Sequence, residues 1–405
     1  MPSRVKLYRS TDAGAPVLSG QAGALVALID AILAGYNSKT VTLARSGSVV
    51  TATGTAHGFN PDGLQVLRIA SADQSEYNGD FPIYNVTANT FQFTVTGTPA
   101  TPATGTITAK ISPADVWVKE FSGTNLGVYR TSDATSGSTR EYYRFDDTTT
   151  TYAGFKGYEA MSDVNSGTDP VTVRYIHKSS TADATARPWV VAVDDRYIHI
   201  LTAFHASYTG YAMYGIGDIL SEVASDPYCG FTFGGDVTAP ASPDVTGSMW
   251  MCYVHELLSN GTTYIKAAGR MARAGAGVVK DVTAWLTHEL LNKAALLTSI
   301  AVAGAANSTT AASFPQNSPV DGSVRAVRLQ VWEAQGASNP LSVGPRGSIP
   351  GLFVPLGYRP VAALGTYGSQ APGTSGRKFM AINIGQNSGA SVSGQVHLDI
   401  TGPWR

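Results

Sequence analysis

The chain has 405 residues, of which 43% are hydrophobic and only 14% are charged, and its formal net charge is −1. Globular proteins carry about a quarter charged residues, so this composition favours a folded, β-rich chain and excludes a disordered one. The near-neutral charge also argues against a basic surface for nucleic-acid phosphates.

The N-terminal residues contain no apolar segment of the kind that a secretory signal peptide needs. No run in the sequence approaches the roughly 18 apolar residues of a membrane span. We therefore expect a soluble product that is made in a cytoplasm and is not inserted into a membrane.

The first expected element is a helix over Ser19–Ala34, where apolar residues recur at helical spacing. Ser19 is a suitable residue to cap its start and Gly35 to end it. Residues 1–40 are thus predicted to form an N-terminal arm and helix.

The segment 41–110 consists of short runs of β-branched and aromatic residues that are closed by Gly, Pro, Asn or Asp. This pattern is typical of antiparallel strands joined by turns. The turn spacing predicts five to seven strands in a small Ig-like or other β-sandwich module.

Residues 111–405 are predicted to form a larger β-rich domain, which leaves room for two subdomains. A second helix is expected over Asp281–Ile300, because its apolar residues fall near one helical face. The expected strands are Trp117–Phe121, Arg140–Phe145, Val171–His177, Trp189–Val193, Tyr197–Phe204, Met249–Val254, Arg325–Trp332, Lys378–Asn383 and Val396–Ile400.

Motifs of catalysis and of cofactor binding are missing from the sequence. It contains no GxxxxGK, no strand-led GxGxxG and no GxSxG. The glycines of Tyr214–Asp218 are interpreted as a loop, and the doublets Asp146–Asp147 and Asp194–Asp195 as loop or cap residues. We therefore expect neither an enzyme nor a cofactor.

Two weaker patterns have alternative interpretations. Asp163, Asn165 and Asp169 place oxygen ligands at alternate positions, as in a calcium loop, but position twelve is Arg174 instead of a glutamate. A solvated turn is the favoured interpretation. Cys229 and Cys252 are interpreted as buried small residues, with a disulfide or a nucleophile as the alternative.

Aromatic residues gather in one part of the large domain, and rings of this kind serve glycan binding, subunit contacts and protein cores. The glycan or interface candidates are Tyr197, Tyr208, Tyr211, Tyr214 and Tyr228. Core and subunit contacts use such rings more often than sugar sites do.

The segment 41–110 also carries an ordered series of phrases, which are AHGF, ADQSEYNG, NTF and TPATPATGT. In this order they resemble a small module of tailed-bacteriophage virion proteins. Further phrases resemble phage structural proteins, namely RSTDAGAPVLSG, GYEAMSDVNSGTDP, YGIGDILSEVASDPY, PRGSIPGLFVPL, GRKFMAINI and the terminal TGPWR.

The resemblance implies a virion structural protein of the tail, baseplate or neck, made in the host cytoplasm, whose partners are other virion proteins. We also expect a homo-oligomer, since most oligomers close by symmetry. Two alternatives are a capsid decoration protein and a host-surface protein that binds a glycan through the tyrosines. A depolymerase ranks last, because no pair of carboxylates is placed for glycoside cleavage.

Overall fold

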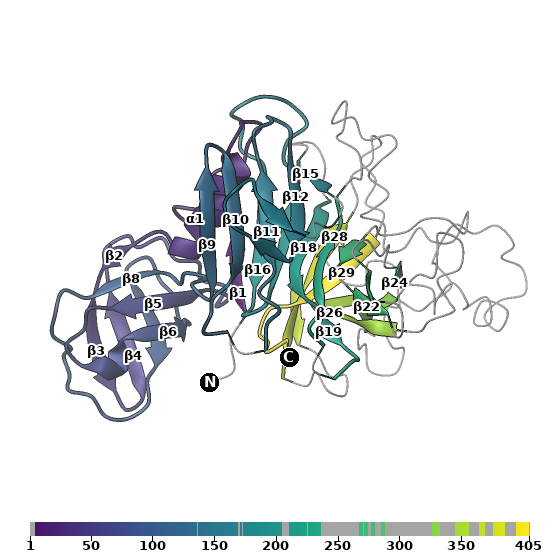
Figure 1. Ribbon diagram of the computed structural model, residues 1–405. Helices are drawn as coiled ribbons and strands as arrows, with labels where there is room; N and C mark the ends of the chain where they lie inside the picture. Colours follow the sequence, from purple (N-terminus) through teal and green to yellow (C-terminus); the bar gives the residue numbers. More distant parts are fainter. Residues whose placement is uncertain are drawn as a thin grey trace, which may run out of the picture.

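A computed structural model shows a mainly β chain with several antiparallel sheets (Figure 1). It describes residues 5–235, apart from 136, 169–170, 172, 205–209 and 225. The other described segments are 267–269, 271–273, 277–279, 285–287, 326–332, 345–355, 364–368, 376–384 and 394–404. The expected strand Met249–Val254 lies outside the described residues.

Residues 39–111 form a unit of two sheets, called here the small module. One sheet has the order β2-β8-β5-β6 and the other β3-β4-β7. Their strands are β2 (Lys39–Thr40), β3 (Thr42–Ser46), β4 (Val49–Thr53), β5 (Val66–Ala70), β6 (Gly79–Pro82), β7 (Thr90–Thr94) and β8 (Thr108–Ile111).

Alternating burial along these strands explains why the two sheets pack face to face. In β7, Phe91 and Phe93 are fully buried, whereas Thr90, Gln92 and Thr94 are not. The ring of Phe93 lies 4.6 Å from the ring of Phe81 in the other sheet, measured between centroids. An immunoglobulin constant domain pairs its first strand with its second, whereas here β2 pairs with the last strand, β8.

The rest of the described chain, called the body, is built on a central sheet with the order β1-β16-β17-β18-β20-β21. Every residue of β16, β17 and β18 is buried. The strands are β1 (Lys6–Arg9), β16 (Trp189–Val193), β17 (Tyr197–Thr202), β18 (Ala212–Asp218), β20 (Gly230–Phe233) and β21 (Ala267–Gly269).

Two further sheets accompany it. One has the order β15-β12-β11-β10-β9 and the other β24-β25-β26-β29-β28-β27, with β19 (Leu220–Ser221) paired to β26. The first comprises β15 (Arg174–His177), β12 (Tyr152–Tyr158), β11 (Tyr142–Asp146), β10 (Leu126–Thr131) and β9 (Trp117–Gly123). The second comprises β24 (Trp285–Thr287), β25 (Ala326–Trp332), β26 (Pro345–Pro355), β29 (Gly394–Asp399), β28 (Lys378–Ile384) and β27 (Thr366–Gly368).

Side-chain contacts show that these two sheets cover opposite faces of the central one. Tyr214 of β18 packs its ring against Phe155 of β12, with centroids 6.4 Å apart. Nε2 of His199 in β17 forms a hydrogen bond with the carbonyl oxygen of Pro350 in β26. Tyr214 lies opposite Ile200, the neighbour of His199, so Tyr214 and His199 point to opposite faces. Double coverage explains the unbroken apolar sequence of β16.

Two short hairpins complete the strands. They are β13 (Ala160–Met161) with β14 (Gly167–Thr168), and β22 (Met271–Arg273) with β23 (Gly277–Val279). The β13–β14 hairpin lies on the outer face of the five-stranded sheet, where Met161 joins the apolar cluster around Val128 and Tyr158.

The helix α1 spans Ala24–Ala34 and buries its apolar side. It begins five residues after Ser19, and its N-cap is Gly23, so Ser19 does not cap it as expected. Gly20 is held against another segment, because a Cβ there would lie 1.8 Å from the carbonyl oxygen of Thr181. Gly35 takes a left-handed φ of 72° at the end of the helix.

Two other expectations need correction. The glycine phrase Tyr214–Asp218 is part of strand β18 rather than a loop. Its Gly217 permits a close backbone approach, since a Cβ would lie 2.0 Å from the carbonyl oxygen of Arg196. In the expected helix 281–300 only Trp285–Thr287 is described, and it forms strand β24.

Candidate functional site

The small module lies to one side of the body and is attached to it through one face (Figure 1). That face belongs to the four-stranded sheet, where Arg68 and Asp80 point outward. Lys6 of strand β1 donates to Asp80 over 2.7 Å and to the Pro113 carbonyl over 2.6 Å. Arg68 binds the same carboxylate with Nε and Nη2, over 2.7 and 2.8 Å.

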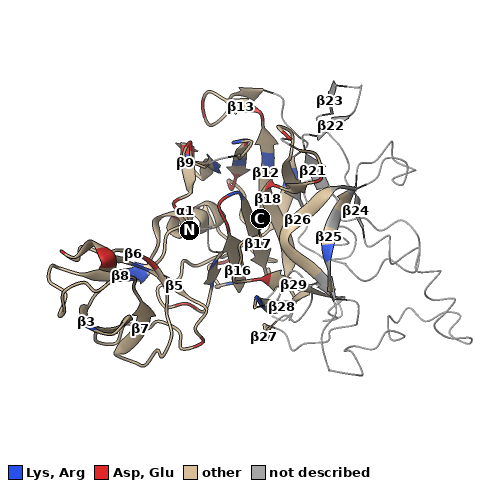
Figure 2. Ribbon diagram, turned by 90° about the horizontal axis from the view of Figure 1, so that it is seen from below, with Lys and Arg blue, Asp and Glu red and all other residues tan. Residues whose placement is uncertain are grey.

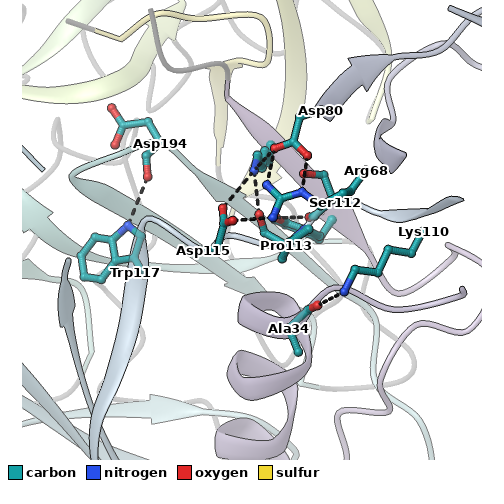
Figure 3. Close-up of polar contacts among 11 residues, drawn as sticks. Ala34, Arg68, Asp80, Lys110, Ser112, Pro113, Asp115, Trp117 and Asp194 are labelled. Atoms are coloured by element: carbon teal, nitrogen blue, oxygen red, sulfur yellow. Dashed lines mark hydrogen bonds and ion pairs between the residues drawn. The ribbon is translucent and has the colours of Figure 1, made fainter. Parts of the chain in front are cut away.

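Three additional bonds extend this junction along the body (Figure 3). Arg68 also pairs with Asp115, which follows the last strand of the module. Lys110 donates to the Ala34 carbonyl at the end of α1 over 2.8 Å. Tyr8 of β1 donates to the Ser112 carbonyl over 2.8 Å. The module is therefore joined to the body by bonds from both β1 and α1.

The pKa of the Asp80 carboxyl follows from this environment. Burial by itself would raise that pKa, but the bonds from Arg68 and Lys6 lower it below the usual value. Asp80 therefore carries its charge at neutral pH and is shared between two cations.

Asp12 forms a second point of attachment, just beyond β1. Its carboxylate is buried and accepts bonds from Asn60 over 2.6 Å and from Gln65 over 3.0 Å. Burial raises the pKa of Asp12, and the nearby Arg9 guanidinium acts in the opposite direction. These bonds fix the loop between β4 and β5 to the body.

The outer face of the other module sheet, β3-β4-β7, points away from this junction and is called the free face. Its nine positions are Thr42, Ala44, Ser46, Val49, Thr51, Thr53, Thr90, Gln92 and Thr94. None of them carries a charge, and none is fully buried. An uncharged sheet surface of this kind suits a protein contact better than a hydrated exterior.

The edges of the β3-β4-β7 sheet are occupied by the module's own chain. Ala103 donates to the carbonyl of Leu43 on β3. Gln92 on β7 exchanges both backbone bonds with Tyr84. A partner therefore cannot extend this sheet by adding a strand, and contact is left to the free face.

Charged residues are also sparse over the rest of the described ribbon (Figure 2). In the described residues, no group of three or more His, Cys, Asp or Glu side chains is placed to hold a metal ion. None of the described helices has the length and apolar character needed to cross a membrane.

The tyrosine candidates are placed mostly in the core. Tyr197 and Tyr214 are 0% and 3% exposed, and Tyr211 is 9% exposed. Tyr228 is half-buried and Tyr208 lies outside the described residues. A ring buried inside the chain cannot stack on a sugar from solvent, so Tyr197 and Tyr214 act as packing residues of β17 and β18.

The calcium candidates form a turn in the hairpin between β13 and β14. The Asp163 carboxylate accepts from the backbone amides of Asn165 and Ser166, over 2.7 and 3.0 Å. The Asn165 side chain accepts from Arg144. Asp169 lies outside the described residues. Oδ1 of Asp163 is thus used in bonds of the turn, and Oδ1 of Asn165 in a bond to β11.

One residue of each aspartate doublet caps a helix or a turn, whereas Asp146 belongs to strand β11 instead of a loop. Asp147 accepts from the Leu25 and Val26 amides at the start of α1, over 2.7 and 3.2 Å. Asp194 accepts from the amides of Arg196 and Tyr197 in the turn before β17. Cys229 is buried, as expected, and Cys252 lies outside the described residues.

No local pattern in the sequence indicated the junction or the free face. Their residues come from segments far apart in the chain, such as Lys6 and Asp80, and only the pairing of the sheets brings them together. Comparison with protein-family models and with curated proteins finds no match for this chain.

Proposed function

We propose that this chain is a structural component of a tailed-phage virion, in the tail, baseplate or neck, and acts through protein–protein contacts. The observation that carries the proposal is the uncharged free face of the small module, held outward by the junction around Asp80. The ordered phrases in residues 41–110, which resemble a module of phage virion proteins, give the class of particle.

The partner is a neighbouring virion protein, and copies of this chain are arranged by the symmetry of the particle. One side of the module is used for its own body, through Arg68, Asp80 and Lys110. The opposite side is available for the neighbour. A two-sided module of this kind links one subunit to the next without a catalytic group.

Capsid decoration is the second candidate, because a module displayed on a shell would use the same free face. It differs from the tail assignment in copy number, with hundreds of copies on a head and far fewer on a tail. A glycan receptor at the tyrosine segment has less support, since Tyr197 and Tyr214 are buried.

The test places a charge at the centre of the free face. Thr51 lies in the middle strand, β4, between Ala44 and Gln92. Thr51 is half-buried and its hydroxyl accepts from Gln92 over 3.2 Å, so Thr51→Glu should keep the fold at a cost of about 1 kcal/mol. Burying the new carboxylate against a neighbour is unfavourable, so the variant should be excluded from particles.

The measurement is the number of copies per purified particle, after complementation of a deletion with wild-type or variant chain. Ser122→Glu is the matched control, because Ser122 is an exposed strand residue of the body, in β9. The proposal expects loss of Thr51→Glu and normal incorporation of Ser122→Glu. Equal incorporation of both would exclude the free face as the contact, and absence of the wild-type chain would exclude the function.

A further inference from the structure

The outer face of the five-stranded sheet carries a feature unrelated to the module. The hairpin β13–β14 covers one part of this face, where Met161 and Val164 pack on Val128. The uncovered part is a hollow of about 340 Å³. We call it the tyrosine hollow, after Tyr152 and Tyr175 on its wall.

An aromatic platform lines one part of the hollow. Gly154 of β12 lies opposite Tyr175 of β15, and a Cβ on this glycine would be 3.5 Å from Cε1 of the tyrosine. The Tyr175 ring therefore extends over the glycine. The Tyr152 ring meets it edge to face, at 5.5 Å and 87°. Both tyrosines are only half-buried, unlike Tyr197 and Tyr214. Ring surface of this kind suits the apolar C–H face of a sugar.

Polar groups on β11 are fixed in place beside this platform. The Asp146 carboxylate accepts from the Thr148 hydroxyl over 2.7 Å and from Arg144 Nη1 over 3.2 Å. Arg144 Nε donates to the Val164 carbonyl over 2.7 Å. These bonds hold a hydroxyl acceptor and a donor in position before a ligand arrives, which reduces the entropy lost on binding.

Lys156 supplies the charge of the hollow. Its ammonium lies 4.7 Å from the Tyr158 ring centroid, and it has no carboxylate partner among the residues that the structure describes. The lining contains two cations, Arg144 and Lys156, and one carboxylate, Asp146. The hollow thus has a surplus of one positive charge, which favours an anionic ligand.

We propose that the tyrosine hollow binds an acidic saccharide, a sugar unit that bears a carboxylate. Tyr175 stacks on the sugar ring, Lys156 pairs with the carboxylate, and Asp146 accepts from a hydroxyl. The arrangement combines an apolar surface with a few convergent polar groups, as small-molecule sites do. This inference goes beyond the assembly function and does not depend on it.

The experiment is calorimetric titration of the full chain with tetragalacturonate and with α2,8-linked tetrasialic acid, using maltotetraose as the neutral probe. At least one acidic probe should bind about tenfold more tightly than maltotetraose, because a charge-assisted contact contributes on this scale. The proposal would be overturned if neither acidic probe bound, or if maltotetraose bound as tightly as the acidic probes.

Two sets of variants test the assigned roles. Lys156→Gln should weaken acidic binding about tenfold, whereas Lys39→Gln in the small module should not change it. Tyr175→Ala should abolish binding, Tyr175→Phe should retain it, and Tyr84→Ala in the module is the matched control.

Thermal melts establish that each variant is folded. If Tyr175→Ala does not fold, Lys156→Gln decides the outcome. If Lys156→Gln bound the acidic probe with wild-type affinity, Lys156 would not pair with the carboxylate. Reduced affinity in Lys39→Gln would show that the probe binds outside the tyrosine hollow.

Discussion

His199 lies in the centre of the body, between the middle sheet and the sheet that contains β26. Its Nε2 is 2.7 Å from the carbonyl oxygen of Pro350, so Nε2 carries the proton and donates it. The ring is fully buried and meets Trp404 edge to face. Burial disfavours the imidazolium and lowers the pKa of His199 to about 4, although the Pro350 carbonyl acts in the opposite direction.

This pKa predicts an acid-sensitive core. Between the unfolded value of 6.5 and the folded value of about 4, the unfolded chain binds more protons than the folded one. The free energy of unfolding should therefore be highest above pH 6.5. It should fall as the pH decreases, by about 3 kcal/mol at pH 4. Urea titrations across this range should show a weaker pH dependence in His199→Gln. If the free energy of unfolding changed equally with pH in the variant and the wild type, His199 would not be the source of the acid sensitivity.

Lys178 and Asp147 form an ion pair that is completely buried at the start of α1. The lysine also donates to the Gln21 carbonyl over 2.6 Å, and the aspartate receives the first helix amides. Lys178→Met would leave the Asp147 charge buried without its cation. We expect a loss of about 3–5 kcal/mol in the free energy of unfolding, measured by guanidinium denaturation.

The matched control for this pair is Lys119→Met. Lys119 pairs with Asp30 on the same helix, but both side chains are partly exposed, at 26% and 39%. An exposed pair contributes up to about 1 kcal/mol. If Lys178→Met and Lys119→Met lost the same free energy of unfolding, the buried pair would contribute no more to the stability of the helix than the exposed one.

At the scale of elements, the junction around Asp80 determines whether module and body unfold together. Asp80→Asn removes the charge that Lys6 and Arg68 share, and we expect about 2 kcal/mol less stability at neutral pH. Calorimetry should then show the module melting before the body. Asp133→Asn is the control, since Asp133 is 75% exposed in its pair with Arg130.

The sign of the pH effect at the junction follows from the lowered pKa of Asp80. Its contribution is complete above the ordinary value of 3.8 and disappears as the pH falls through the lower folded value. Wild type and Asp80→Asn should therefore become equally stable in strong acid. A difference between them that does not decrease as the pH falls below 3.8 would show that the carboxylate charge is not the stabilising feature.

Local patterns in the sequence predicted that the chain is mainly β. Short runs of β-branched and aromatic residues closed by turn residues, as in 41–110, are typical of antiparallel strands. β16 coincides with the expected Trp189–Val193, because a short run of large apolar residues is typical of a buried strand.

Long-range contacts account for what local patterns missed. Asp147, which caps α1, is 122 residues away in the sequence from Leu25, whose amide it accepts. The residues around Ser19 therefore contain no pattern that indicates this cap. In the same way, the tyrosine hollow depends on the register that places Gly154 opposite Tyr175. The sequence showed only a glycine and two tyrosines at separate positions.

At the scale of the whole molecule, the body uses both ends of the described chain. Strand β1 pairs with β16 in the central sheet, and Trp404 is buried near the other end. Gly351 adopts a φ of +66°, and a Cβ there would lie 2.2 Å from the Trp404 indole. The small module lies in sequence between α1 and β9 and extends to one side of the body (Figure 1). None of its strands belongs to the three sheets of the body.

This arrangement gives a scaffold with one outward-directed module, and we propose that the scaffold belongs to a phage particle. The measurement that tests it most directly is quantitative mass spectrometry of purified particles, with heads and tails separated. We predict that the chain occurs in the tail fraction, at low copy number. Hundreds of copies in the head fraction would indicate a contact on the capsid surface instead, and absence from the particles would exclude a virion function.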